Sequence, residues 1–146
     1  MPVFGSPDIK KLKFRQDIHR LIKALNTQPD SKIRKAAVLA LGDMGAVIRA
    51  TPKEKLAIAA LSNTLQNDSE DILIRLLAID SLLNVGSSGV ILPLVEGMKL
   101  DNRHISNIAF NALETQGFRP FIHAVTLAKI NLYAKFGAPW GYPDEK

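Results

Sequence analysis

One stretch constrains the fold of this chain more than any other, because it is a complete amphipathic helix that recurs twice. Residues 33–45 read IRKAAVLALGDMG, with apolar side chains at helical spacing and a glycine at the end. Glycine suits the position after a helix because it accepts a left-handed backbone conformation there. Looser copies end at Gly86 and Gly117, so the stretch is the unit of a repeat. Aligning the copies on Gly45, Gly86 and Gly117 also aligns Ile33 with Ile74 and Ile105, Ala37 with Ala78 and Ala109, and Leu41 with Leu82 and Leu113.

A second apolar helix is expected before each copy. Its apolar stripe is formed by Leu21, Ile22 and Leu25 in the first unit, by Leu61 and Leu65 in the second, and by Leu94 and Met98 in the third. Short polar residues come just before each copy, where a side-chain oxygen can accept bonds from free backbone N–H groups. These residues are Asp30, Asp71 and Asn102. Each unit is therefore predicted to be a helix, a short turn, and a second helix that a glycine closes.

The offsets between the copies, 41 and 31 residues, differ because of one insertion near residues 47–55. Within it, the run TPKE at 51–54 combines an N-cap threonine, a proline at the first helical position and a capping-box glutamate. It predicts a long helix from Pro52 to about Gln66. A short helix is expected at 8–13, and no segment alternates with period two over a useful length, so no sheet is expected.

The sequence therefore predicts an all-α chain, an α-solenoid of about three helix pairs with terminal capping helices, in one domain over residues 1–136. Its units are expected at about residues 8–45, 52–86 and 90–117, because stacked pairs bury apolar surface that one pair leaves exposed. A capping helix is expected at 120–136 and an extended tail at 137–146. The capping helix is apolar on more than one face, so either the tail covers it or a second copy does, as a homodimer.

The first unit resembles the HEAT-like repeat named after phycobilisome lyases. The residues that carry the resemblance lie at 21–25, 30–37 and 40–45, and the second unit shares Asp71, Ile74, Arg75, Ala78, Leu82 and Gly86. The resemblance covers about residues 8–117. It implies a solenoid with the first helix of each pair on the convex side and the second on the concave side. Similar repeats occur in bilin lyases, a metal-dependent hydroxylase, DNA-repair glycosylases and many scaffolds, so the fold does not fix an activity.

The composition narrows the class of protein. The 146 residues include no cysteine, which excludes disulfides, a thiol nucleophile and cysteine-based metal sites. No apolar run approaches the roughly 20 residues that cross a bilayer, and residues 1–7 lack the pattern of a signal peptide. We therefore expect a soluble cytoplasmic protein.

The positive charge of the chain is concentrated at one end. Residues 1–35 hold nine lysines and arginines but three acidic residues, whereas the remainder is close to neutral. The cations of the first two expected helices are Lys10, Lys11, Lys13, Arg15, Arg20 and Lys23. Such an end can attract an acidic protein, a nucleic acid or an anionic membrane, and it can equally be a solvated helical face.

Patterns for catalysis or metal binding are sparse. The histidines are His19, His104 and His123. None lies at ligand spacing from another ligand, and no nucleotide loop or serine-hydrolase elbow occurs, so we expect no metal or other cofactor and no catalytic residue. Asp30 and Arg34 recur as Asp71 and Arg75 at the same spacing. Because a catalytic site occurs once, this recurrence favours a cap plus an arginine that ties adjacent repeats through bidentate bonds.

The second helix of each pair is expected to present a mixed surface on the concave side. The core positions of the first copy are Ile33, Ala37, Ala40, Leu41 and Met44. The opposite positions in the three copies are Lys35, Val38, Leu39 and Asp43, then Leu76, Ile79, Asp80 and Asn84, then Asn107, Phe110, Asn111 and Thr115. The alternative is that Val38, Ile79 and Phe110 pack against neighbouring second helices.

Exposed apolar residues flanked by amides suit a peptide or protein surface. The leading hypothesis is a non-catalytic scaffold that binds a protein partner on its concave face, with the basic end steering an acidic one. The residues predicted to bind are Lys32, Lys35, Leu39, Ile79, Asp80, Phe110 and Asn111. One alternative is a bilin lyase or tetrapyrrole chaperone, which only the resemblance implies. The other is nucleic-acid binding through the basic end, although a nucleic-acid groove should carry lysine and arginine along its whole length.

Overall fold

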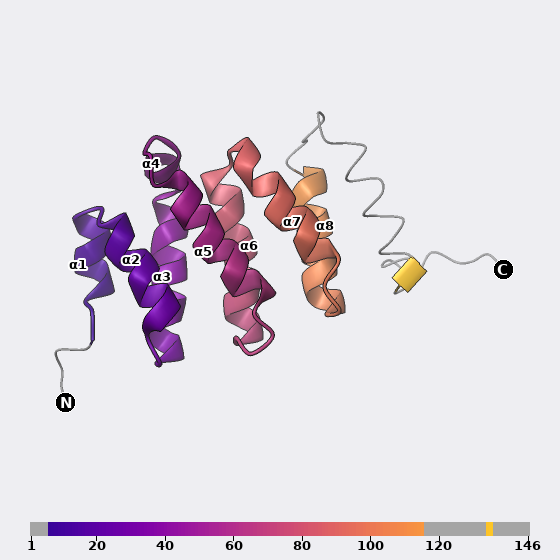
Figure 1. Ribbon diagram of the computed structural model, residues 1–146, viewed down its shortest axis with the longest axis horizontal. Coiled ribbons are helices and arrows are strands. Elements are labelled where there is room, and N and C mark those ends of the chain that lie inside the picture. The colour runs from indigo at the N-terminus through magenta and orange to yellow at the C-terminus, as the bar shows by residue number, and fades with distance from the viewer. Residues whose placement is uncertain (1–5, 116–133, 136–146) are drawn as a thin grey trace. The chain divides into compact units, whose positions relative to one another are not determined.

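The computed structural model of the chain describes residues 6–115 and 134–135 (Figure 1). Every regular element within these residues is helical, which confirms the predicted all-α class. The elements are α1 (Ile9–Phe14), α2 (Ile18–Thr27), α3 (Ser31–Asp43), α4 (Gly45–Arg49), α5 (Glu54–Gln66), α6 (Ile72–Val85), the 3₁₀ turn η2 (Ser88–Val90), α7 (Ile91–Met98) and α8 (Arg103–Thr115). None of these helices combines the length and the apolar composition that crossing a bilayer requires.

The chain divides into two compact units, Met1–Val90 and Ile91–Lys146. Unit 1 contains two helix hairpins, α2–α3 and α5–α6. The two first helices, α2 and α5, pack against each other, and so do the two second helices, α3 and α6 (Figure 1). The short helices complete the unit, because α1 packs on α2 and α3, and α4 packs on α6. The insertion expected near residues 47–55 thus covers the end of α4, the turn after it and the beginning of α5.

The repeat columns form the core of unit 1. Ala37 and Leu41 of α3 and their equivalents Ala78 and Leu82 of α6 are all fully buried, as predicted. Ile74 is buried as well, whereas Ile33 is only half-buried near the beginning of α3. Since burying one aliphatic side chain contributes roughly 1.5–3 kcal/mol, these columns hold the two hairpins together.

Capping side chains begin the second helices where the sequence predicts. The Asp30 carboxylate accepts a hydrogen bond from the Lys32 backbone N–H at 2.9 Å, and Asp71 accepts one from Leu73 at 2.8 Å. The predicted beginning of α5 at Pro52 is wrong by two residues, because the helix begins at Glu54. The Thr51 hydroxyl donates to the Ile48 carbonyl of α4, so this threonine ends the preceding turn before α5 begins.

Two of the repeat glycines have different roles. Gly86 closes α6 with a left-handed φ of 68°, as predicted. Gly45 does not: it begins α4, and among the described residues Gly86 is the only glycine with positive φ. A Cβ on Gly45 would lie 2.9 Å from the backbone nitrogen of Val85 and would collide with the carbonyl of Asn84. Gly45 is therefore required by close packing of two backbones. Gly117 lies outside the described residues.

A tight turn sets the position of α1 beside α2. The backbone N–H of Asp17 donates to the Leu12 carbonyl at 2.9 Å, and that of Gln16 donates to Lys13 at 3.0 Å. This pair of bonds is a Schellman motif, in which Gln16 adopts a left-handed φ of 57°. The turn directs the cationic side chains of α1 and α2 to the same end of unit 1.

Unit 2 contains the α7–α8 hairpin. The Asn102 side chain accepts a bond from the Ile105 N–H at 3.1 Å, which confirms the predicted cap. The repeat columns of α8, Ile105, Ala109 and Leu113, are buried. Lys135 pairs with Asp101 at 2.5 Å, and its hydrogen bond holds the pKa of that carboxyl below its ordinary value.

The expected capping helix at 120–136 lies outside the described residues except for the helical positions 134–135, and the expected tail at 137–146 lies outside them entirely. That residues 1–136 form one domain stays a prediction.

Candidate functional site

The exposed side of α3 and α6 presents matching positions of the two copies. Lys32, Lys35 and Leu39 follow one another on α3 at spacings of three and four residues, which places them on one helix face. The equivalent residues of α6 are Leu73, Leu76 and Asp80. We call these six residues the α3–α6 face. Four of them belong to the predicted binding set and are exposed: Lys32, Lys35, Leu39 and Asp80. Of the other two, Leu73 is exposed and Leu76 is half-buried.

Two predicted binding residues are not available on any surface. Ile79 is fully buried, and Phe110 is 1% exposed, so the prediction that they contact a partner is wrong. Val38 is buried too, which supports packing against the neighbouring helix as the correct interpretation for α3 and α6. The Ser81 hydroxyl of α6 donates to the Val38 carbonyl of α3 at 2.8 Å, so the two helices meet along this line. Lateral packing therefore covers a second stripe of each helix.

Asn111 is exposed on α8 and belongs to unit 2, so the α3–α6 face is defined from unit 1 alone.

The sequence did not identify Leu73 as a binding residue, although its exposed fraction of 47% is close to the 42% of Leu39. The repeat offset of 41 residues from Lys32 could have found it. The face thus combines three leucines with two lysines and one aspartate.

The lysines of the face carry available charge. Within the part of the chain that the structure describes, neither Lys32 nor Lys35 forms an ion pair. Asp80, on the neighbouring helix, is the acidic member of the face and is also without one there. The face therefore offers two cations near the beginning of α3 and one carboxylate on α6.

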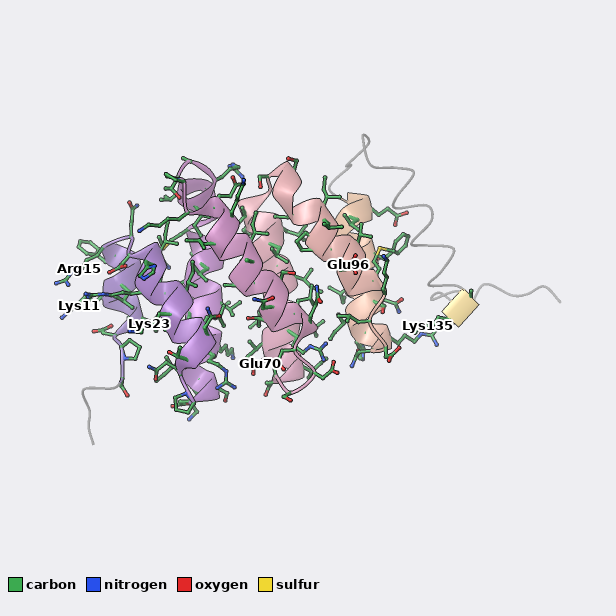
Figure 2. The ribbon with its side chains drawn as sticks, viewed as in Figure 1. Lys11, Arg15, Lys23, Glu70, Glu96 and Lys135 are labelled. Atoms are coloured by element: carbon green, nitrogen blue, oxygen red, sulfur yellow. The ribbon has the colours of Figure 1, made fainter. Side chains whose placement is uncertain are left out.

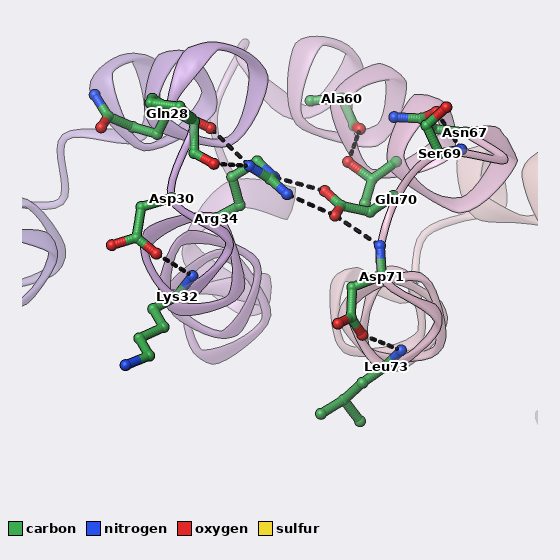
Figure 3. Close-up of polar contacts among 12 residues, drawn as sticks. Gln28, Asp30, Lys32, Arg34, Ala60, Asn67, Ser69, Glu70, Asp71 and Leu73 are labelled. Atoms are coloured by element: carbon green, nitrogen blue, oxygen red, sulfur yellow. Dashed lines mark hydrogen bonds and ion pairs between the residues drawn. The ribbon is translucent and has the colours of Figure 1, made fainter.

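An arginine clamp joins the two hairpins next to this face (Figure 3). Arg34 Nε donates to Glu70 Oε2 at 2.8 Å, and Nη2 donates to Oε1 at 2.9 Å. Nη1 also donates to the carbonyls of Gln28 and Pro29. The hydrogen bond from Arg34 lowers the pKa of Glu70 and raises that of Arg34. The predicted bidentate tie between repeats is confirmed for Arg34, with Glu70 as the partner.

The second arginine of the recurring pair behaves differently. Arg75 is buried, and its Nε donates to the Leu65 carbonyl at 2.9 Å, at the end of α5 in its own hairpin. Its Nη2 lies 3.7 Å from a carboxylate oxygen of Asp68. The prediction that Arg75 ties adjacent repeats is therefore not matched by these contacts. The two arginines share a position, but the loop that follows each first helix differs in length and partners.

A polar groove of about 360 Å³ borders the clamp. Its lining includes the amides Asn63 and Asn67 and both members of the Arg34–Glu70 pair. Because Arg34 and Glu70 neutralise each other, the described lining of this groove offers amide and hydroxyl hydrogen bonding rather than net charge. It is consistent with a structural role of the clamp.

A basic groove of about 350 Å³ lies between α1 and α2. Lys11, Arg15, Arg20 and Lys23 line it, and Figure 2 labels three of these cations at this end of unit 1. Lys13 is not in the lining and pairs with Asp43 of α3 at 2.6 Å. The sequence identified these cations as a charged end but did not predict a groove. The spacings of four residues on α1 and three on α2 are the signal that could have found it.

Residues for metal chemistry are not brought together. In residues 6–115 and 134–135, no group of three or more His, Cys, Asp or Glu side chains could hold a metal ion. His19 and His104 are exposed on α2 and α8, and His123 lies outside the described residues.

Comparison with protein families, with curated proteins and with solved structures finds no match to this chain. The two hairpins of unit 1, the clamp and the two charged surfaces are therefore the basis for a functional proposal.

Proposed function

We propose that this protein is a non-catalytic helical-repeat module of the α-solenoid type that binds a protein partner on the α3–α6 face. One observation carries the proposal: exposed leucines occupy the outward positions of two helices that pack side by side. Exposed aliphatic side chains mixed with charged ones have the composition of a protein interface. The resemblance to HEAT-like repeats supports the same class of protein.

The apolar part of the binding energy is modest for each residue. Leu39 and Leu73 expose 42% and 47% of their surface, so a partner can bury about half of each side chain. With roughly 1.5–3 kcal/mol for complete burial, each leucine contributes about 1 kcal/mol. Replacing one of them by alanine should therefore weaken binding about fivefold. A carboxylate at the same position should weaken it more, because burial of an unpaired charge is costly.

The charges of the face favour one orientation of the partner. Lys32 and Lys35 lie near the beginning of α3 and attract acidic side chains, whereas Asp80 on α6 attracts a basic one. Exposed charges at the rim of an interface chiefly change the association rate and its salt dependence. We therefore expect reversal of both lysines to slow association, with a smaller effect on dissociation.

Site-specific crosslinking in the native host tests the proposal. The photo-crosslinker benzoylphenylalanine is placed at Leu39 and, as a matched control, at Leu56, which is exposed on α5 in the other helix layer. We expect one defined protein adduct at position 39 that position 56 does not give. The double variant Leu39→Glu with Leu73→Glu should lose that partner, whereas Leu56→Glu should retain it. Equal adducts at both positions, or full binding by the double variant, would refute the proposal.

A further inference from the structure

The groove between α1 and α2 carries cations on both of its rims (Figure 2). Lys11 and Arg15, at the end of α1, are four residues apart, and Arg20 and Lys23 on α2 are three residues apart. At a helical rise of about 1.5 Å, these pairs are spaced by roughly 6 Å and 4.5 Å along their helices. A ligand in the groove therefore meets positive charge on two sides.

Most of this charge has no acidic partner in the described part of the chain. Lys11, Arg15 and Lys23 take part in no ion pair there, and Arg20 lies 3.6 Å from Asp17. Asp8 is the acidic residue in the groove lining, and its carboxylate accepts a hydrogen bond from the Lys11 backbone as the cap of α1. The groove is thus a positively charged site with its cations exposed to solvent.

The remaining lining, as far as residues 6–115 form it, is small and contains no aromatic side chain. Leu12 and Ala24, both buried, contribute apolar surface, and Thr27 and Gln28 contribute polar groups at the end of α2. The α2 helix has ten residues, so the groove is at most about 15 Å long. That length accommodates roughly four to five residues of extended peptide, at about 3.3 Å for each residue.

We propose that the α1–α2 groove binds an extended acidic peptide segment with its carboxylates divided between the two rims. Successive side chains of an extended peptide point to opposite sides, so a run of four acidic residues directs two carboxylates to each rim. Alternate side chains are about 6.6 Å apart, close to the rise of roughly 6 Å between Lys11 and Arg15. The arginines can each bind a carboxylate through two parallel hydrogen bonds.

A nucleic-acid strand fits this groove less well. A single strand presents one row of phosphates, which would use one rim, and its bases bind through stacking on aromatic side chains. None of the described residues that line the groove is aromatic. The inference goes beyond the proposed function because it concerns α1 and α2, whereas the partner surface proposed above lies on α3 and α6.

Fluorescence anisotropy with the full chain tests the inference. The probe is a fluorescein-labelled hexapeptide of alternating aspartate and glutamate, and the comparison ligand is a labelled single-stranded hexathymidylate. The groove variant is Lys11→Glu with Lys23→Glu, one reversal on each rim. The matched control is Lys53→Glu with Lys55→Glu, because both lysines are exposed in unit 1 and the change in net charge is identical. Circular dichroism verifies that all variants remain folded. If the groove variant does not, Lys11→Gln with Lys23→Gln replaces it and Lys53→Gln with Lys55→Gln becomes the matched control.

We expect the groove variant to weaken peptide binding about tenfold or more, and the control to weaken it less than about twofold. Binding should also weaken steeply as salt is raised, because the charges are exposed. Equal losses in both variants would show attraction by net charge alone and would overturn the inference. Tighter binding of hexathymidylate than of the peptide, lost in the groove variant, would identify a nucleic-acid site and would overturn it too. Neither result would depend on whether Leu39 and Leu73 bind a partner.

Discussion

The Arg34–Glu70 clamp makes a quantitative prediction, because it joins two hairpins through one carboxylate. Replacing Glu70 by alanine removes the two charge-assisted hydrogen bonds of 2.8 and 2.9 Å from Arg34, and also a bond of 2.8 Å from the Asp71 backbone N–H. Such bonds contribute roughly 1.5–3 kcal/mol each. Arg34 would retain its bonds to the carbonyls of Gln28 and Pro29, and 22% of its side chain is exposed, so water replaces part of the loss. We therefore expect a loss of about 2–3 kcal/mol, below the roughly 3–5 kcal/mol for breaking a fully buried pair.

Urea and thermal unfolding measure this loss. A destabilisation of about 2–3 kcal/mol should lower the midpoint of thermal unfolding by roughly 4–12 °C for a chain of this size. A double-mutant cycle of Glu70→Gln with Arg34→Met isolates the pair and should give a coupling energy of about 1–2 kcal/mol. The matched control is Asp43→Ala, which breaks the exposed pair with Lys13 and should cost less than about 0.5 kcal/mol. A coupling energy below about 0.5 kcal/mol would refute the clamp as a stabilising tie.

Four further predictions follow from single positions. Arg34 holds the pKa of Glu70 below its ordinary 4.5. The stability that the pair contributes is therefore complete above about pH 4.5 and is lost as the pH falls through the lower pKa of the folded state. In urea titrations between about pH 6 and 3, the unfolding free energy should fall more steeply with decreasing pH for the native chain than for Glu70→Gln. Gln16→Gly should raise the unfolding free energy by up to about 1 kcal/mol in the same assay, because the native φ is left-handed. Gly45→Ala should lower it by roughly 1–3 kcal/mol through overpacking, and unchanged stability would contradict the close backbone contact. Ile79→Ala should cost about 2–5 kcal/mol, whereas Leu39→Ala should cost less than about 1 kcal/mol; similar values would contradict their assignment to core and surface.

Local signals correctly predicted where the second helix of each pair begins. Asp30, Asp71 and Asn102 were identified by residue type and position, and each accepts a backbone bond at the beginning of its helix. The reason is that a cap needs only a short polar side chain within three residues of the N–H groups it binds. The alanine and leucine columns were equally predictable, because each is buried in all three copies, whereas in the isoleucine column Ile33 is only half-buried.

Contacts between helices were not predictable from the periodicity of one helix. The pattern of α3 assigns one face to the core and leaves Val38 on the other, but α6 packs along α3 and buries it. The α6 sequence is apolar nearly all round, which is the sign of a helix covered on more than one side. This apolar composition indicated that α6 is buried on several sides, but it did not identify which of Leu73, Leu76 and Ile79 would remain exposed.

Glycine was ambiguous for a related reason. Gly45 and Gly86 look alike in the alignment, because a left-handed residue and a close backbone contact both require the absence of a Cβ. The sequence cannot separate these two causes without the neighbouring helix. The same holds for the two arginines: Arg34 binds Glu70 in the neighbouring hairpin, whereas Arg75 donates to the Leu65 carbonyl at the end of α5 in its own hairpin.

The contacts between α3 and α6, which the sequence did not predict, also affect how the α3–α6 face can bind a partner. The clamp between Arg34 and Glu70 ties the beginning of α3 to the residue that precedes the N-cap of α6. At the other end, a Cβ on Gly42 would lie 2.6 Å from the Ser81 hydroxyl, and Gly45 approaches the backbone of Asn84. The two helices are thus held together at both ends of the face. A preorganised surface loses little conformational entropy on binding, so Glu70→Ala should weaken partner binding by loosening the helix pair although Glu70 is not one of the six residues of the face.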